Sequence, residues 1–151
     1  MRYLFIDDDE EYSRQVISIL ERKFPPMRGN IDLIASEKEF FDRLASPEDF
    51  NYAFIILDIM LRWSSASDES NPHPAKVPGG YLKAGVRILN ALRKDPRGAS
   101  LPIIIHTARG SERVEEAMEE WGISKYGIVV VRKWGDLHEL VEELKKRLSS
   151  I

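Results

Sequence analysis

Two kinds of segment alternate along the chain, and both are defined by where the hydrophobic residues fall. One kind is a short apolar run rich in Ile, Val and Phe, with the length of a single strand. The last three of these runs contain almost no polar residues, which is typical of strands covered on both faces in a parallel sheet. We therefore expect five strands, at Tyr3–Ile6, Ile31–Ala35, Tyr52–Leu57, Pro102–His106 and Ile128–Val131.

Between the apolar runs, hydrophobic residues recur three and four positions apart, as they do on one face of a helix. The stripes are Tyr12, Val16, Ile19 and Leu20; Phe40, Phe41 and Leu44; Val86, Leu89 and Leu92; Val114, Ala117, Met118 and Trp121; and Leu137, Leu140, Val141, Leu144 and Leu148. Pro25 and Pro26 follow the first stripe and Gly122 the fourth, where helices should end. Five strand–helix units in succession predict an α/β fold, a doubly wound sheet with right-handed crossovers.

One stretch interrupts this alternation. Residues 62–80 are polar, contain three prolines and show no periodicity. We predict a long surface loop here, inserted into a single domain that spans residues 1–151. A linker between two domains is the competing interpretation, but either half alone would lack a complete sheet.

Composition and charge exclude several classes of function. The chain has no cysteine, so disulfides, thiolate catalysis and cysteine-ligated metals are excluded. Its net charge of −3 is mild and its basic residues are scattered, so we expect no direct binding to nucleic acid. No apolar run is long enough to span a bilayer, and the N-terminus lacks the layout of a signal peptide. We therefore expect a cytoplasmic protein with no membrane attachment.

Reactive side chains follow the predicted strands at their carboxyl ends. Residues 7–9 are all aspartate and follow the first strand, while Asp58 follows the third, Thr107 the fourth and Lys133 the fifth. In an open α/β sheet the functional crevice lies at this edge, so we expect these groups to converge there. His106, inside the fourth strand, is expected to be packed rather than catalytic.

Crowded carboxylates repel one another, and a hard divalent cation with oxygen ligands such as Mg²⁺ removes that penalty. With the metal bound, Asp58 can act as a carboxylate nucleophile toward phosphorus, while Thr107 and Lys133 neutralise charge on the transferred group. Each residue also has a structural explanation by itself. The acidic run can stabilise a helix start, and Asp58 can be a turn residue. The ordered set on four strand ends favours the functional interpretation.

Four stretches resemble the receiver domains of two-component response regulators: residues 4–9, 55–61, 101–108 and 130–133. Residues 85–89 also look like the glycine-led third helix of that family. The resemblance covers the chain apart from the inserted loop. It implies a flavodoxin-like (βα)5 sandwich whose five parallel strands have the order 2-1-3-4-5.

The resemblance implies a role for each acidic residue. Asp58 is the phosphorylated residue. Asp7 and Asp8 are the acid pair that holds Mg²⁺, Asp8 directly, together with Asp58 and the backbone carbonyl of Met60. Asp9 falls outside the metal-binding pair and is expected at the start of the first helix.

The same resemblance makes Thr107 the switch hydroxyl that moves toward the phosphoryl group and Lys133 the ion-pair partner of that group. The sequence departs from the family at two nearby positions. Trp134 follows Lys133 where the family normally has proline, and Val130 stands where a Tyr or Phe usually swings inward on activation. The usual coupling between the threonine and an aromatic residue therefore cannot operate as it does in the family.

The implied function is a phosphoacceptor switch. A histidine kinase or phosphotransfer protein donates a phosphoryl group to Asp58, and binding to a downstream protein target changes. Such a domain is not an enzyme acting on other molecules, since its chemistry is limited to self-phosphorylation and slow autodephosphorylation. Because the chain ends at Ile151, just after the fifth helix, we expect no output domain to follow. We then expect the signal to be passed on by partner binding at the fourth and fifth helices, including homodimerisation. The alternative is that this sequence is one domain excised from a larger protein.

Two other functions stay open. A degenerate receiver would bind partners without being phosphorylated, which the residues at 130 and 134 and the insertion favour. A Mg²⁺-dependent phosphatase of the haloacid dehalogenase type is suggested because Asp7-x-Asp9 resembles its nucleophile motif. That family needs a further acidic pair after the lysine, and it leaves Asp58 without a role. The loop at 62–80 is either a tolerated insertion or a lid or partner-recognition element beside Asp58.

Overall fold

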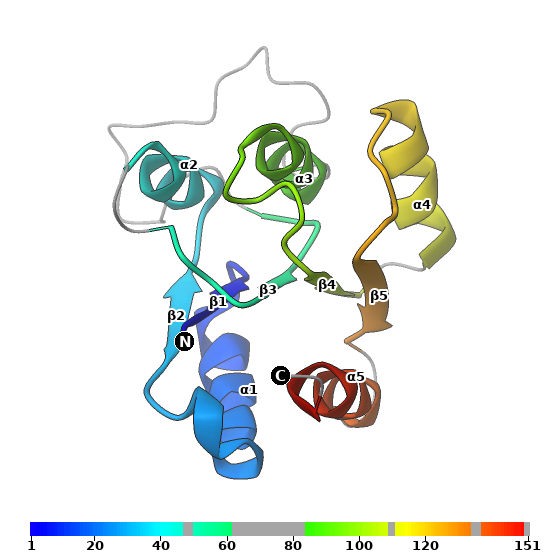
Figure 1. The fold of residues 1–151 in the computed structure, drawn as a ribbon. Helices are drawn as coiled ribbons and strands as arrows, with labels where there is room; N and C mark the ends of the chain where they lie inside the picture. Colours follow the sequence, from blue (N-terminus) through cyan, green and yellow to red (C-terminus); the bar gives the residue numbers. More distant parts are fainter. Residues whose placement is uncertain (47–49, 62–83, 109–110, 134–136, 150–151) are drawn as a thin grey trace.

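A computed structural model describes residues 1–46, 50–61, 84–108, 111–133 and 137–149. Strands and helices alternate through these residues (Figure 1). The strands are β1 (Tyr3–Ile6), β2 (Ile31–Ile34), β3 (Ile55–Leu57), β4 (Ile103–Thr107) and β5 (Ile128–Arg132). The helices are α1 (Glu10–Lys23), α2 (Glu37–Ala45), α3 (Ala84–Lys94), α4 (Ser111–Glu120) and α5 (His138–Ser149), with a short 3₁₀ helix at Pro25–Met27.

All five strands pair in parallel in the order β2-β1-β3-β4-β5, which confirms the predicted fold class and strand order. In the central register, Phe5 lies beside Ile56, and Ile56 lies beside Ile104. Strands on both sides of residues 62–83 therefore belong to one sheet. The predicted insertion at 62–80 itself lies outside the described residues, as does Trp134.

The third strand is shorter than predicted. It begins at Ile55 rather than at Tyr52, although Tyr52 and Phe54 are both buried. The hydroxyl of Tyr52 donates to Asp32 Oδ2 at 2.9 Å, so this residue is used in a side-chain network. The apolar run correctly predicted that these residues are buried, but a buried residue need not be part of a hydrogen-bonded strand.

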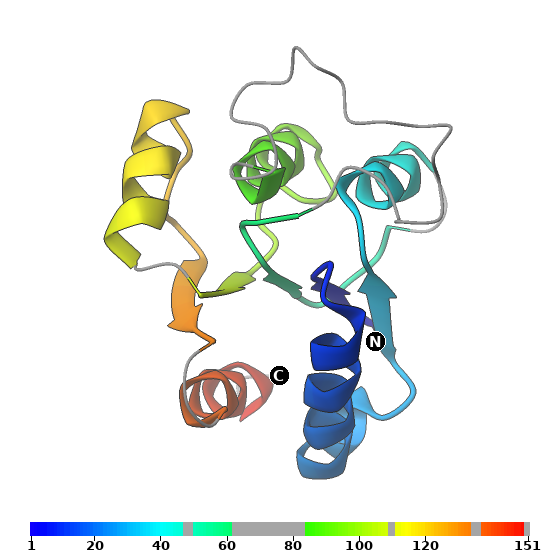
Figure 2. The ribbon, with the colours of Figure 1, turned by 180° about the vertical axis from the view of Figure 1, so that it is seen from behind.

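Helices cover both faces of the sheet. Figures 1 and 2 show α1 and α5 on one face and α2, α3 and α4 on the other. Because alternate side chains of a strand point to opposite faces, Phe5 and Ile56 pack with α1 and α5, while Leu4 and Leu57 pack with the other three helices. Burying one such side chain fully stabilises the fold by about 1.5–3 kcal/mol.

Helix α3 begins in direct backbone contact with the segment that follows β3. The N–H of Gly85 donates to the Ile59 carbonyl at 2.8 Å. A Cβ atom at position 85 would lie 2.5 Å from Ile59 Cα and 2.7 Å from the Asp58 carbonyl oxygen. A side chain at this position would clash with that backbone, so residue 85, in the first turn of α3, needs to be glycine.

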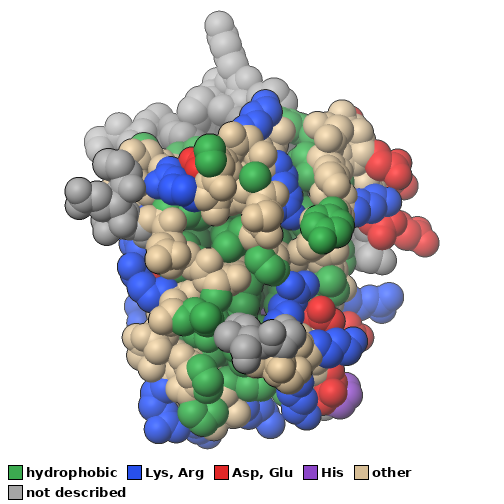
Figure 3. Space-filling view, viewed as in Figure 1, with side chains coloured by type: hydrophobic (Ala, Val, Ile, Leu, Met, Phe, Trp, Pro, Cys, Tyr) green, Lys and Arg blue, Asp and Glu red, His purple; other side chains and the backbone are tan. Residues whose placement is uncertain are grey.

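The surface gives two further observations. In Figure 3, acidic side chains gather on the side of the molecule formed by α4. Helix α4 has five exposed glutamates, at Glu112, Glu115, Glu116, Glu119 and Glu120. Within the described part of the chain, no helix is both long and apolar enough to cross a membrane.

Candidate functional site

The ends of β1 and β3 place two carboxylates side by side. Asp7 follows β1, and its N–H donates to the Ile34 carbonyl at 3.0 Å. Asp58 follows β3, and its N–H donates to the Ile6 carbonyl at 2.9 Å. The parallel hydrogen-bond pattern thus continues one residue beyond each strand, so the backbone holds both aspartates at the carboxyl edge of the sheet.

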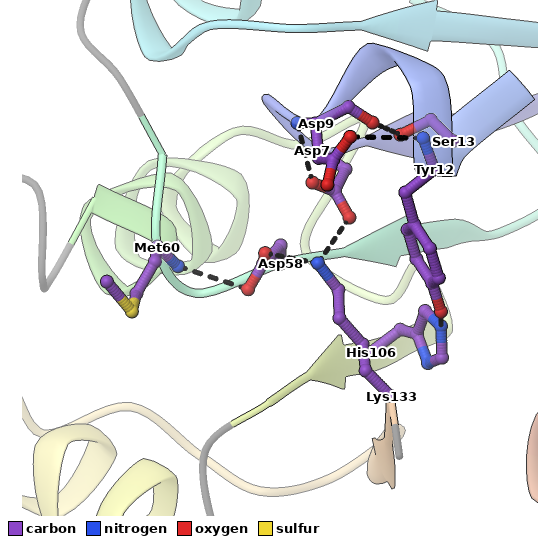
Figure 4. Close-up of polar contacts among 8 residues, drawn as sticks. All are labelled: Asp7, Asp9, Tyr12, Ser13, Asp58, Met60, His106 and Lys133. Atoms are coloured by element: carbon purple, nitrogen blue, oxygen red, sulfur yellow. Dashed lines mark hydrogen bonds and ion pairs between the residues drawn. The ribbon is translucent and has the colours of Figure 1, made fainter. Parts of the chain in front are cut away.

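Lys133 bridges the two carboxylates. Its Nζ lies 2.6 Å from Asp7 Oδ2 and 2.8 Å from Asp58 Oδ2 (Figure 4). The backbone N–H of Lys133 donates to the Thr107 carbonyl at 3.0 Å, which continues the β4–β5 pairing to this point. Since β4 separates β5 from β3, the long lysine side chain crosses β4 to reach Asp58. We call Asp7, Asp58 and Lys133 the Lys133 cluster.

The remaining carboxylate oxygens accept backbone hydrogen bonds. Asp7 Oδ1 accepts from the N–H of Asp9 at 3.0 Å, and Asp58 Oδ1 accepts from the N–H of Met60 at 3.2 Å. The exposed fraction is 1% for Asp7 and 7% for Asp58. Both side chains are therefore fixed in orientation, and Asp58 is the one that retains some access to solvent.

The charges of the Lys133 cluster do not balance. Burial raises the pKa of Asp7 to about 6, and the Asp58 charge acts in the same direction against the opposing effect of Lys133. Burial by itself lowers the pKa of Lys133, but the two carboxylates outweigh it and raise this pKa above its usual value. Two acids thus share one permanently charged ammonium group, and the excess negative charge is buried.

The other predicted metal ligands, Asp8 and Met60, lie next to the two carboxylates that carry this excess negative charge. Oxygen donors beside uncompensated carboxylate charge suit a hard divalent cation such as Mg²⁺. Asp8 lies half-buried in the same turn as Asp7, and Met60 is 39% exposed beside Asp58. Among the described residues, however, no three His, Asp or Glu side chains converge into one metal-binding group. The backbone carbonyl of Met60 remains the predicted additional oxygen ligand.

The other predicted residues take up clear positions. Thr107 is the last residue of β4 and is almost fully buried, between the ends of β3 and β5. Asp9 is the N-cap of α1, where its Oδ1 accepts from the N–H of Tyr12 at 3.0 Å. This agrees with the expectation that Asp9 belongs to the helix start. Val130, at the departure noted above, is partly buried and packs on the face covered by α2, α3 and α4.

Two neighbours of the cluster were not expected from the sequence. The hydroxyl of Tyr12 lies 2.8 Å from His106 Nε2, and Lys133 Nζ lies 5.0 Å from the centroid of the Tyr12 ring (Figure 4). Burial and the Lys133 charge lower the pKa of His106 to about 4, so this histidine is neutral at physiological pH. The spacing of apolar residues predicted only a packing role for Tyr12. A lone histidine in an isoleucine-rich strand was the one signal that a polar partner existed.

Comparison with known proteins reveals the fold class. No protein-family model and no curated protein matches the sequence. Solved structures do match: a receiver domain of a DNA-binding response regulator from Colwellia psychrerythraea 34H superimposes with a TM-score of 0.67 at 17% identity, covering 99% of this chain and 98% of that one. A receiver domain of a two-component histidine kinase from Clostridium thermocellum gives 0.66 at 20% identity, covering 97% and 96%.

A third structure, a CheY-like receiver domain from Methanospirillum hungatei JF-1, gives a TM-score of 0.63 at 18% identity, covering 99% of this chain and 94% of that one. Identities this low establish the fold rather than the function. The chain therefore has the CheY-like fold of response-regulator receiver domains.

Proposed function

We propose that this chain is a single cytoplasmic receiver domain in which Asp58 accepts a phosphoryl group from a histidine kinase or phosphotransfer protein. One observation supports this above all others: the Lys133 ammonium lies 2.8 Å from Asp58 Oδ2 at the carboxyl edge of the sheet. A carboxylate that is fixed, slightly exposed and paired with a cation is suited to attack phosphorus. The neighbouring Asp7 holds the same ammonium group from the other side.

In the proposed reaction, a carboxylate oxygen of Asp58 forms a bond to phosphorus as the P–N bond to the donor histidine breaks. The released imidazole keeps the electron pair of that bond and takes a proton from solvent. Lys133 is already in place to neutralise charge on the phosphoryl oxygens, so little reorganisation is needed. The Thr107 hydroxyl is proposed to contact the phosphoryl group and to report its presence.

The donor set also supports a role for Mg²⁺. When bound, the ion neutralises the carboxylates and the phosphoryl oxygens. Asp8, Asp58 and the Met60 carbonyl would hold it, with Asp7 as the second acid of the predicted pair. Asp7 then serves two purposes, because it keeps Lys133 beside Asp58 and contributes negative charge for the cation.

Phosphorylation is proposed to change binding at α4, α5 or β5, either to a downstream protein or to a second copy of this chain. The exposed glutamates of α4 favour a protein partner with complementary basic residues. Such a partner would bind more weakly as the salt concentration rises, because exposed charges are screened.

Intact-mass spectrometry tests the central claim. The protein is incubated with Mg²⁺ and acetyl phosphate, beside Asp58→Asn and a control incubation with EDTA. We expect wild type to gain one phosphoryl mass, and both the variant and the EDTA sample to gain none. A gain that persists in Asp58→Asn would contradict the assignment of the acceptor. No gain in wild type would favour a receiver that binds its partners without phosphorylation.

The phosphatase alternative is less well supported. Its motif would need Asp9 at the reacting centre, but the Asp9 side chain accepts a backbone hydrogen bond and caps α1. Peptide mapping separates the alternatives, since a phosphatase of that type would carry phosphate on Asp7 rather than on Asp58.

A further inference from the structure

The position of Lys133 depends on more than its two carboxylates. Lysine has a flexible four-carbon side chain with several rotatable bonds, so one fixed position for its ammonium group needs support along the chain. The Nζ atom lies 5.0 Å from the centroid of the Tyr12 ring, within the range of a cation–π interaction. The ring therefore faces the ammonium group from the α1 side of the sheet.

Tyr12 is itself held at two points. Its backbone N–H donates to Asp9 Oδ1 at 3.0 Å in the first turn of α1. Its hydroxyl lies 2.8 Å from Nε2 of His106, and the two rings stack with centroids 6.0 Å apart and an interplanar angle of 19°. The ring has little freedom to turn away from Lys133.

His106 is a suitable fixed partner for the hydroxyl. It is 1% exposed and belongs to β4, directly before Thr107. Its neutral form can hydrogen-bond to the hydroxyl without adding a second positive charge next to Lys133. His106, Tyr12 and Lys133 thus form a continuous series of contacts from inside the sheet to Asp58.

We propose that Tyr12 is a positioning residue for phosphoryl transfer: its ring, fixed by His106, holds the Lys133 ammonium between Asp7 and Asp58. This inference rests on the proposed function. It explains why a polar histidine and tyrosine lie on a face of the sheet otherwise packed with hydrophobic side chains. It also links the surface of α1 to the acceptor, because Tyr12 is half-buried and lines a cavity of about 610 Å³ between α1 and α5.

The rate of Asp58 phosphorylation by acetyl phosphate in Mg²⁺ is the first measurement. Tyr12→Leu removes the ring and should slow the reaction about fivefold, as expected for a lost cation–π contact of roughly 1 kcal/mol. Tyr12→Phe keeps the ring but loses the hydroxyl, and should slow it about twofold. The control is Tyr126→Leu, because Tyr126 is 85% exposed and outside the cluster; its rate should equal that of wild type.

A double-mutant cycle separates positioning from a merely structural role. In a Lys133→Met background, Tyr12→Leu should have no further effect on the rate, because the group that it positions is gone. A fivefold loss that persists in this background would overturn the proposal. A Tyr12→Leu rate equal to that of the Tyr126→Leu control would also overturn the positioning role. Neither result would contradict the proposal that Asp58 accepts the phosphoryl group.

Nuclear magnetic resonance provides a test that does not need phosphorylation. Ring current from Tyr12 should shift the ε-CH₂ protons of Lys133 upfield in wild type, less so in Tyr12→Phe, and not in Tyr12→Leu. If wild type accepts no phosphoryl group, the proposed function fails, and the chemical shift alone tests whether Tyr12 positions Lys133. A Lys133 shift that the substitutions leave unchanged would then overturn the positioning role. If Tyr12→Leu does not fold, unchanged rate and shift in Tyr12→Phe overturn it equally.

Discussion

Two groups of buried charges lie at the carboxyl edge of the sheet, and they differ in balance. Glu37 and Arg87 join the start of α2 to the start of α3 through two hydrogen bonds of 2.5 and 2.7 Å, with exposed fractions of 1% and 9% for their side chains. Among the described residues, one acid meets one base here, and each carboxylate oxygen of Glu37 accepts a hydrogen bond from Arg87. In the Lys133 cluster, two acids meet one base.

The difference in charge balance indicates different roles: a structural role for the Glu37–Arg87 pair and a chemical role for the Lys133 cluster. Because Arg87 already donates to both carboxylate oxygens of Glu37, we interpret this pair as fixing the two helices relative to each other. The Lys133 cluster keeps excess negative charge and a carboxyl group with a raised pKa. Buried charge of that kind is costly for folding, and its persistence at a strand edge is typical of functional sites.

Breaking the balanced pair should have the largest effect. Arg87→Met leaves the Glu37 carboxylate buried without this partner and should lower the free energy of unfolding by about 3–5 kcal/mol. Urea denaturation measures this. The matched control is the double variant Glu37→Leu with Arg87→Met, which removes both charges and should regain most of the loss. A double variant as unstable as the single one would show that packing, not charge, accounts for the effect.

Breaking the unbalanced cluster should affect chemistry more than stability. Lys133→Met removes a preorganised cation beside Asp58 and should slow phosphorylation by acetyl phosphate about 100-fold. Arg87→Met should slow phosphorylation far less. This variant is measured without denaturant, at a temperature where it is folded. Equal slowing in the two variants would contradict the assignment of Lys133 to the reaction.

The raised pKa of Asp7 predicts a pH dependence of stability. A carboxyl group whose folded pKa is about 6 stabilises the fold fully below its unfolded pKa near 3.8, and loses that contribution as the pH rises through 6. Asp7→Asn lacks this loss. In EDTA, its stability relative to wild type should therefore fall by on the order of 2–3 kcal/mol between pH 7.5 and pH 4.

His106 contributes with the opposite sign, because its pKa is lowered from 6.5 to about 4 and stability is lost as the pH falls through that range. Both proteins contain His106, so this contribution largely cancels in the difference between them. Parallel urea titrations at several pH values measure that difference. A difference that does not vary with pH would mean that Asp7 ionises as an ordinary carboxyl group.

An exposed pair should show the smallest effect. Lys125 lies 3.5 Å from Glu119 and 3.7 Å from Glu115 on the outside of α4. Water and salt screen such contacts, so Lys125→Ala should change the free energy of unfolding by less than about 0.5 kcal/mol. Thermal melts at low and high salt measure this. A loss of about 2 kcal/mol would mean that this exposed contact is as important for stability as a buried one, contrary to the expected difference between exposed and buried charges.

The sequence was most informative where a repeating pattern controls the structure. Alternating apolar runs and helical stripes predicted five parallel strands, because each pattern reflects which faces are buried. Asp7, Asp58 and Lys133 were found for a related reason, since the carboxyl ends of parallel strands share one edge. Their exact pairing, with one lysine between two acids, still required the structure.

Other contacts left no repeating pattern in the sequence. Tyr12 and His106 are 94 positions apart, and Glu37 and Arg87 are 50 apart. Each residue alone has an ordinary explanation, as a stripe residue, a packed histidine or a helix-start acid. Only the packing of α1 on the sheet and of α2 beside α3 makes partners of them.

The contact between Gly85 and Ile59 has a consequence for how this fold can change during evolution. It joins the two ends of residues 62–83 through the backbone. When the ends of a connection are already held together, each doubling of its length costs only about 0.6 kcal/mol in closure entropy. New sequence can therefore be gained or lost between Leu61 and Ala84 without moving Asp58 or α3. The position of Asp58 is thereby independent of the length of the connection that follows it.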